Sequence, residues 1–308
     1  KFGFDPAFNV ARIFHTAARS VAQHRGHPGC FTAAAFISYG ITALGGAGAA
    51  RMMSSTCGNL QVEQFLCLND NYGYLIHDSS TGATAAVDTP DASVYLNVLQ
   101  KKGWKLDFIL NTHHHHDHAG GNLELKRATG CKIIGPRGEM DRIPGIDLPV
   151  DDGDTFTFGS QQALVLNVGG HTRGHVAYHF PAARGAFVGD ALFALGCGRI
   201  FEGTPEQMFA SLQKLRALPD ETAVYCAHEY TAANARFALT MEPGNEALQR
   251  RAGEITELRA KGVPTVPTTI ALEKATNPFL RWDSPEVARV AGFDPATGDH
   301  GLAVFTET

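Results

Sequence analysis

A run of seven residues, T-H-H-H-H-D-H at 112–118, places four consecutive histidines next to an aspartate and a fifth histidine. Side chains two apart in an extended chain point to the same side, so His113 and His115 can share one direction. Where the chain turns into a helix after them, Asp117 and His118 point elsewhere. Because imidazole and carboxylate groups bind zinc, iron and manganese, this one run can supply ligands to two metal ions.

Three isolated residues, His171, Asp190 and His228, each follow a short apolar run at a predicted strand end. Taken singly, the aspartate could cap a helix and the histidines could be hydrogen-bonded core residues. Sites in layered α/β folds gather at strand ends, so we expect the three to join the histidine run. A solvated polar loop or an affinity tag explains the run less well. Adjacent histidines repel each other once protonated, and a tag would lie at a terminus.

Short apolar runs that alternate with helical patterns predict an α/β domain over 59–228, which must position these side chains. The expected strands are 61–67, 72–77, 85–88, 107–111, 132–134, 155–158, 163–168, 176–180, 186–188 and 224–227. The expected helices are 91–102, 121–129 and 205–217. Residues 229–308 follow as a smaller helical domain, with helices at 231–240 and 245–260 and an extended segment at 264–269.

Composition narrows the functional class. The 308 residues carry a formal net charge of −5 and no run of Lys and Arg, which argues against a nucleic-acid partner. Six cysteines lie far apart without a C-x-x-C pair, so we interpret them as reduced thiols and exclude a zinc ribbon.

The first 58 residues hold five of the 26 basic residues but only one of the 31 acidic residues. An acid-poor, arginine-bearing start is typical of a transit peptide, so we predict import into the mitochondrion, with the plastid as the alternative. A disordered extension and a membrane anchor are the competing interpretations. Segment 30–50 is uncharged but only weakly apolar, which disfavours stable membrane insertion. A start at Met52 or Met53 would give a cytoplasmic form that keeps every candidate ligand.

These motifs resemble those of the metallo-β-lactamase superfamily, and within it those of glyoxalase II, the hydroxyacylglutathione hydrolases. The resemblance rests on T-H-H-H-H-D-H at 112–118, H-T-R-G-H at 171–175, G-D at 189–190, G-C-G-R-I-F-E-G-T at 196–204, H-E-Y-T at 228–231, E-P-G-N at 242–245 and N-P-F-L-R at 277–281. It runs from about residue 60 to residue 294. It implies an αββα sandwich followed by a smaller C-terminal α-helical domain.

The resemblance also implies a division of the ligands between two divalent metal ions, with zinc expected and iron or manganese as alternatives. One ion would be held by His113, His115 and His171, and the other by Asp117, His118 and His228. Asp190 would bridge the two ions, and Asp117 and Asp190 are the expected catalytic carboxylates. His114, His116 and His175 lie outside this set, with His175 expected to support it.

A thioester hydrolysis follows from such a pair of ions. Together they lower the pKa of a shared water from 15.7 to roughly 7, which gives hydroxide at neutral pH. Hydroxide would attack the thioester carbonyl and expel a thiolate, a good leaving group because its thiol pKa is about 8.5. The resemblance implies S-D-lactoylglutathione as the substrate and D-lactate and glutathione as the products, a step of methylglyoxal detoxification. We expect a monomer.

Four residues match family positions around the glutathione part of the substrate: Arg199, Phe201, Tyr230 and Asn234. Arg199 suits a carboxylate, and Phe201 stands where some members have tyrosine. Tyr230 and Asn234 lie four apart on one helix face, where ordinary packing is the competing explanation. Many members end in a basic R-x-x-K pattern, whereas 296–308 contains no Lys or Arg. Either Arg199, Arg281 or Arg289 replaces that pattern, or the thiol carrier differs.

Four other functions compete with the thioesterase. A mononuclear iron sulfur dioxygenase acting on a persulfide belongs to the same superfamily, but the long helical tail favours the hydrolase. A catalytically inactive metal-binding scaffold is disfavoured because all seven ligands are present. A lactamase lacks the helical tail, and a metallo-RNase needs a basic surface.

Overall fold

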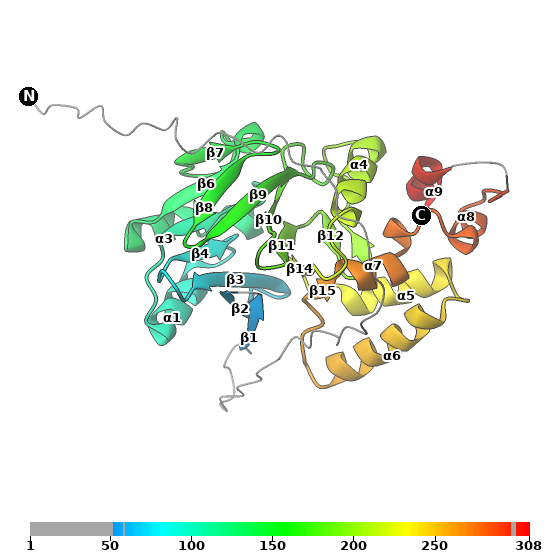
Figure 1. The fold of residues 1–308 in the computed structure, drawn as a ribbon, viewed down its shortest axis with the longest axis horizontal. Coiled ribbons are helices and arrows are strands. Elements are labelled where there is room, and N and C mark those ends of the chain that lie inside the picture. The colour runs from blue at the N-terminus through cyan, green and yellow to red at the C-terminus, as the bar shows by residue number, and fades with distance from the viewer. Residues whose placement is uncertain (1–51, 58, 297–299) are drawn as a thin grey trace, which may run out of the picture.

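The computed structural model describes residues 52–57, 59–296 and 300–308. Two β-sheets stack on each other, helices cover their outer faces, and further helices gather on one side of the sandwich (Figure 1). The expected αββα sandwich with a helical C-terminal region is confirmed. The predicted transit peptide and its alternatives fall mainly on residues 1–51 and so lie outside the described residues.

The first sheet has seven strands in the order β1-β2-β3-β4-β5-β6-β7. They are β1 (Met52–Cys57), β2 (Leu60–Cys67), β3 (Asn71–Asp78), β4 (Thr84–Val87), β5 (Phe108–Leu110), β6 (Lys132–Pro136) and β7 (Leu148–Val150). The first four are antiparallel neighbours, whereas β4 to β7 run parallel and need crossover segments. The crossovers contain α1 (Ala92–Lys102), α2 (His116–Ala119), α3 (Asn122–Thr129) and η2 (Arg137–Glu139).

The second sheet has six strands in the order β15-β14-β11-β10-β9-β8. They are β8 (Thr155–Phe158), β9 (Gln161–Asn167), β10 (Val176–Phe180), β11 (Gly185–Gly189), β14 (Ala223–Cys226) and β15 (Thr268–Thr269). β12 (Leu192–Phe193) and β13 (Gly196–Cys197) form a separate hairpin, and α4 (Pro205–Arg216) follows it. β11 and β14 are parallel, so the segments after them leave the sheet at the same edge.

Local capping sets both ends of α1 and the start of α4. The side chain of Asp91 accepts a hydrogen bond from the backbone N–H of Ser93 at the start of α1, and Gly103, at φ 68°, ends that helix. Thr204 and Gln207 form a reciprocal capping box at the start of α4. Because α4 begins where the 190–204 segment ends, this cap anchors one end of that segment.

Two buried apolar layers hold the sandwich together. Tyr74 of the first sheet and Tyr178 and Phe187 of the second sheet belong to one core cluster. On the outer side of the first sheet, Tyr95 of α1 and Leu125 of α3 belong to a second cluster. Full burial of a large apolar side chain contributes roughly 1.5–3 kcal/mol, so these layers dominate the stability of the fold. The polar residues described below are left at the edge of the sandwich.

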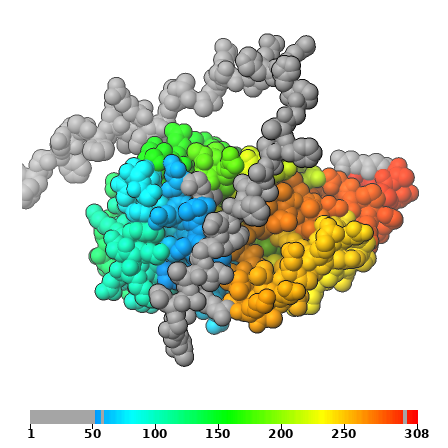
Figure 2. Space-filling model, turned by 60° about the horizontal axis from the view of Figure 1, so that its bottom comes forward, coloured from blue at the N-terminus to red at the C-terminus, as the bar shows by residue number. Residues whose placement is uncertain are grey.

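The C-terminal helices lie directly beside the sheets, yellow to red in the space-filling view (Figure 2). They are α5 (Thr231–Met241), α6 (Glu246–Ala260), α7 (Ile270–Thr276), η3 (Pro278–Leu280), α8 (Pro285–Val290) and α9 (Gly301–Glu307). Trp282, Val287 and Phe305 share the inter-sheet core cluster with Met208 of α4. None of the helices in the described ranges combines the length and apolarity needed to cross a membrane.

Two strands of the sandwich lie outside the α/β domain predicted over 59–228, and β7, β12 and β13 lie within it but were not predicted. β1 lies within 1–58, the segment expected to precede the folded domain, yet it pairs with β2 from Met52↔Phe65 to Cys57↔Leu60. Its sequence, M-M-S-S-T-C, lacks a clear alternation of apolar and polar residues, so the pairing with β2 determines its conformation. β15 lies in the expected extended segment 264–269 and joins the second sheet beside β14. The C-terminal region therefore contributes a strand to the sandwich.

Candidate metal centre

The seven predicted ligands all follow strands of the sandwich. His113 and His115 follow β5, and Asp117 and His118 lie in α2, the short helix directly after them. The other three follow strands of the second sheet: His171 after β9, Asp190 after β11 and His228 after β14. The structure brings all seven together, because these strand ends meet where the two sheets face each other.

One group of ligand atoms consists of imidazole nitrogens alone. His113 Nε2 lies 3.0 Å from Nδ1 of His115, and His171 Nε2 lies 3.1 Å from the same atom. All three nitrogens lie within 4.8 Å of one another, and the side chains of His113 and His171 are buried. Three convergent nitrogens of this kind can hold a divalent cation.

A second group combines imidazoles with a carboxylate. Oδ2 of Asp117 lies 3.6 Å from Nε2 of His118 and 3.6 Å from Nε2 of His228. The three ligand atoms again lie within 4.8 Å of one another. Asn71 donates a hydrogen bond from Nδ2 to Oδ2 of Asp117 at 3.0 Å, which orients the carboxylate toward the two histidines.

Asp190 lies between the two groups. Its Oδ2 is 3.3 Å from Nε2 of His171, and its Oδ1 is 3.5 Å from Nε2 of both His118 and His228. Oδ1 of Asp190 and Nε2 of His118 are buried and have no hydrogen-bond partner among the described residues. Unpartnered buried polar atoms are costly, and a cation between them would satisfy both. The residues present therefore fit a pair of metal ions.

In most of these imidazoles, the ring nitrogen that faces away from the cluster already has a hydrogen-bond partner. Nδ1 of His118 lies 2.8 Å from Oδ2 of Asp88, and Nδ1 of His228 lies 3.0 Å from Oδ1 of Asp70. Nδ1 of His171 lies 2.8 Å from the backbone oxygen of Arg199. A partner on Nδ1 fixes the tautomer and leaves the lone pair of Nε2 free to bind a metal ion. These partners therefore orient the rings toward the cluster.

The pKa values of the cluster reflect burial and mutual charge. Burial lowers the pKa of His113 well below its usual value, and the neighbouring imidazoles, His118 first, lower it further. Burial also lowers the pKa of His118, but the carboxylates of Asp190 and Asp88 outweigh it and raise that pKa to about 9. Burial raises the pKa of Asp190, but His118 and His228 hold it below its usual range. A charged carboxylate beside buried imidazoles is the donor set that divalent cations prefer.

The histidines expected to lie outside the ligand set have different surroundings. His116 is exposed at the start of α2. His114 turns away from the cluster, and its Nδ1 lies 2.7 Å from Oε2 of Glu139. Nε2 of His175 accepts a hydrogen bond from the backbone N–H of Asp190 at 3.1 Å. His175 thus holds the backbone of Asp190, the residue that lies between the two groups.

Three of the four predicted substrate residues lie at the mouth of the cluster. The ring of Phe201, 57% exposed, lies 5.1 Å from the ring of His171, and the guanidinium of Arg199 lies 5.2 Å from the centre of the Phe201 ring. Tyr230 is half-exposed and stacks on His228, with ring centres 4.7 Å apart. These side chains form a partly apolar, partly cationic rim. The fourth, Asn234, contacts the protein itself.

Asn234 donates a hydrogen bond from Nδ2 to the backbone oxygen of Ala194 at 2.9 Å. Ala194 lies in the turn between β12 and β13, and a Cβ on Gly196 would lie 2.6 Å from Nδ2 of Asn234. The amide group therefore packs against the β12-β13 hairpin. This contact matches the helix-packing explanation that competed with substrate binding.

Sequence reasoning missed several carboxylates around the cluster. Asp88 follows β4, so the strand-end argument that selected Asp190 could have selected it as well. Asp70 lies in the turn between β2 and β3 and had only a turn-forming explanation. Glu139, at the end of η2, carried no signal in its local sequence.

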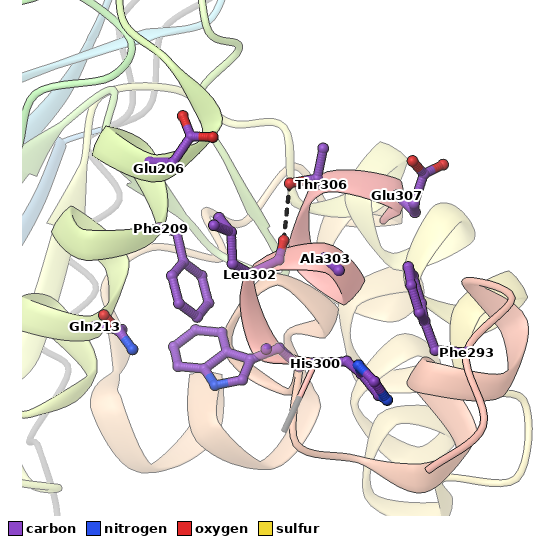
Figure 3. Close-up of a pocket in the computed structure, with 11 residues that line it drawn as sticks. Glu206, Phe209, Gln213, Phe293, His300, Leu302, Ala303, Thr306 and Glu307 are labelled. Atoms are coloured by element: carbon purple, nitrogen blue, oxygen red, sulfur yellow. Dashed lines mark hydrogen bonds between the residues drawn. The ribbon is translucent and has the colours of Figure 1, made fainter. Parts of the chain in front are cut away.

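A cavity of about 640 Å³ lies between α4 and α9 (Figure 3). Its lining includes the aromatic rings of Phe209, Trp282 and Phe293, with Glu206 and Glu307 also in its wall. None of the seven predicted ligands lines it. Among the described residues, every group able to hold a metal ion lies elsewhere. This cavity is therefore not the metal centre.

Comparisons with known proteins cover both parts of the chain. Residues 69–228 match the metallo-beta-lactamase superfamily, and residues 229–307 match the hydroxyacylglutathione hydrolase C-terminus. The hydroxyacylglutathione hydrolase of Hyphomonas neptunium is 57% identical over 233 residues, which cover 76% of this chain and 91% of that protein. That of Brucella anthropi is 54% identical over 255 residues, which cover 83% of this chain and 97% of that protein.

A solved structure supports the fold. The crystal structure of ETHE1 from Myxococcus xanthus is 25% identical to this chain, with a TM-score of 0.56. The match covers 80% of this chain and 99% of that one. The similarity thus includes most of the sandwich described above.

Proposed function

The chain belongs to the hydroxyacylglutathione hydrolases of the metallo-β-lactamase superfamily, and from this premise we propose that it hydrolyses S-D-lactoylglutathione to D-lactate and glutathione. Thioester hydrolysis follows from family membership, while the lactoyl group and the glutathione carrier are the finer assignment. The position of the Asp190 carboxylate between two groups of ligand atoms supports the hydrolysis most directly. That arrangement suits two ions acting on one substrate carbonyl.

We propose the following ligands: His113, His115 and His171 for one ion, Asp117, His118 and His228 for the other, and Asp190 for both. Zinc is the first candidate because imidazole and carboxylate groups are its usual ligands, and iron or manganese suit the same donors. When bound, the pair supplies Lewis-acid chemistry that acidifies a water to a pKa of roughly 7.

The residues at the mouth would bind and orient the substrate. Burial, followed by the charge of Asp70, raises the pKa of Tyr230 to about 12, so its phenol keeps its proton at neutral pH and can donate a hydrogen bond. The exposed ring of Phe201 offers an apolar wall next to His171. The guanidinium of Arg199 can bind a carboxylate of glutathione. The leaving thiol has a pKa of about 8.5, so no residue has to protonate the thiolate as it departs.

The test compares substrates and metal content in one preparation. Purified protein should contain two metal ions per chain and should hydrolyse S-D-lactoylglutathione faster than lactoyl thioesters of other thiols. Oxygen consumption with glutathione persulfide, the reaction of the competing dioxygenase, should be absent. Protein that carries two ions but hydrolyses no glutathione thioester would overturn the assignment. Faster hydrolysis of another lactoyl thioester would instead change only the thiol carrier.

A further inference from the structure

Glu139 is a buried carboxylate that the chemistry above does not use. It ends η2, the 3-10 helix after β6, and is only 2% exposed. Its Oε2 accepts hydrogen bonds from the backbone N–H and from Nδ1 of His114, at 2.8 and 2.7 Å. Its Oε1 accepts from the backbone N–H of Gly174 at 2.9 Å and from the hydroxyl of Thr172. Each carboxylate oxygen therefore serves a different loop.

The two loops are those that carry the first group of ligands. His114 lies between His113 and His115, and Thr172 directly follows His171. The ligand nitrogens of His115 and His171, one from each loop, are 3.1 Å apart. Metal sites must hold their ligands to within about 0.5 Å of the productive geometry. The distance between these two loops must therefore be held nearly constant.

Close packing fits Glu139 to this position. A Cβ on Gly174 would lie 2.6 Å from Cγ of Glu139 and 3.2 Å from the carbonyl carbon of Gly138. Only glycine allows the loop to approach the carboxylate so closely without a shift of one of them. The backbone of the 171–175 loop is thus seated directly on the Glu139 side chain.

We propose that Glu139 is a positioning residue, whose carboxylate holds the 113–115 and 171–174 loops at the spacing that one metal ion requires. This inference rests on the proposed function, because it takes His113, His115 and His171 as ligands. Loss of a partner behind a metal ligand typically costs roughly 10- to 100-fold in metal affinity or activity. Glu139 acts on the backbone of both ligand loops at once, so we expect an effect in that range.

Two substitutions distinguish the length of the Glu139 side chain from its negative charge. Glu139→Gln keeps the size of the side chain but places an amide NH2 against the donors of one loop, so that loop loses its acceptor. Glu139→Asp keeps the charge but is one methylene shorter and cannot reach both loops. If only the negative charge is required, Glu139→Asp should retain zinc as the unmodified protein does. If hydrogen bonds to both loops are required, both variants should lose zinc faster. Thr172→Val, which removes one donor to the carboxylate, is a milder third variant.

The experiment measures how fast zinc-loaded protein releases zinc to a chromogenic chelator, beside metal content and thioester hydrolysis. We expect Glu139→Gln and Glu139→Asp to release one of the two ions roughly 10- to 100-fold faster than the unmodified protein. Thr172→Val should change release in the same direction by less. The kcat of the Gln variant should fall while KM changes little, and excess zinc should restore much of the loss. Asp141→Asn is the matched control, because this exposed neighbour removes the same charge without touching either loop.

The outcomes distinguish this inference from the proposed function. If Glu139→Gln and Thr172→Val release zinc as slowly as the unmodified protein, the proposed role of Glu139 is overturned, even if the unmodified protein is an active thioesterase. Normal zinc retention in Glu139→Asp would show that the negative charge is sufficient and that hydrogen bonds to both loops are not required. Unmodified protein that binds two zinc ions but hydrolyses no thioester would remove the proposed function, while the release rates still decide the role of Glu139. Unmodified protein that binds neither zinc, iron nor manganese would overturn both.

Discussion

The guanidinium of Arg281 is bound in a two-pronged ion pair to the carboxylate of Glu242. Nε of Arg281 lies 2.6 Å from Oε2, and Nη2 lies 2.7 Å from Oε1. Nη1 donates a third hydrogen bond to the backbone oxygen of Lys274 at 3.0 Å. Arg281 therefore ties the end of α5 to the segment after η3. A side chain committed in this way is not available to a substrate carboxylate, which removes Arg281 as a replacement for the basic pattern of other family members.

Arg281→Ala is accordingly expected to affect stability rather than substrate binding. Removing one partner of a largely buried ion pair costs roughly 3 kcal/mol, because the other charge is left without compensation. Urea unfolding should show this loss. KM for S-D-lactoylglutathione should stay within about twofold, or about 0.4 kcal/mol of binding free energy, because Arg281 is bound to Glu242 and does not contact the substrate. A large rise in KM with unchanged unfolding would return Arg281 to the substrate site.

The same pair predicts a pH dependence. Burial raises the pKa of Glu242, but hydrogen bonds from Arg281, Ser284 and Asn245 outweigh it and hold the pKa below its usual value. The folded-state pKa is thus lower than the unfolded value of about 4.3. The stabilisation is present above the unfolded pKa and is lost as the pH falls through the folded pKa.

Glu242→Gln should therefore be less stable than the unmodified protein at pH 7, and the difference should shrink below about pH 4. Free energies of unfolding of both proteins in urea, measured from pH 7 down to the acid transition, check this expectation. A difference that stays constant over the whole range would contradict the depressed pKa.

Arg199 remains the candidate for the glutathione carboxylate. Its guanidinium lies over the ring of Phe201, and among the described residues no carboxylate pairs with it. A charge-assisted hydrogen bond is worth roughly 1.5–3 kcal/mol, and the exposure of Arg199 favours the lower end. Arg199→Ala should raise KM about tenfold and lower kcat less, because the contact exists in both ground and transition states. Arg127→Ala, at an exposed arginine of α3, is the control and should leave KM unchanged. An unchanged KM in Arg199→Ala would place the anchor elsewhere.

The convergence of the seven predicted ligands could be anticipated from the sequence, because each of them follows a strand end or lies in one short run. His171 and Asp190 come straight after apolar segments whose strand character is clear. The residues that orient the ligands were not predictable in this way. Asp70 meets His228 across 158 positions of sequence, and Glu139 meets Gly174 across 35. Such carboxylates follow no local pattern, so only the packing of the loops reveals their role.

The histidine run permits a graded test of side-chain direction. His113 faces the cluster, His114 faces Glu139, and His116 is exposed. His113→Ala should abolish most activity and lower the metal content. His114→Ala should have an intermediate effect through the contact with Glu139, and His116→Ala should remain close to the unmodified protein. Equal damage from all three substitutions would contradict the alternation of side chains along the loop.

Asp190 offers the sharpest test of two ions sharing one carboxylate. Its backbone N–H is held by His175, so a change of the side chain should leave the loop in place. Asp190→Ala removes both oxygens that face His118, His171 and His228, and two cations without a shared anion would repel each other. We expect the variant to keep one ion per chain. Activity should fall by about 100-fold or more, since several kcal/mol of transition-state stabilisation depend on the pair.

Metal analysis and thioester hydrolysis on the same preparation measure both effects. Asp220→Asn is the control, because this exposed carboxylate pairs with Lys274 and lies outside the ligand groups. One ion with full activity would mean that the second ion has no part in hydrolysis, and the role of Asp117 would then need revision. Two ions with normal turnover would mean that Asp190 does not bridge the ions. The Asp190 carboxylate would in that case contribute only its negative charge beside the surrounding imidazoles.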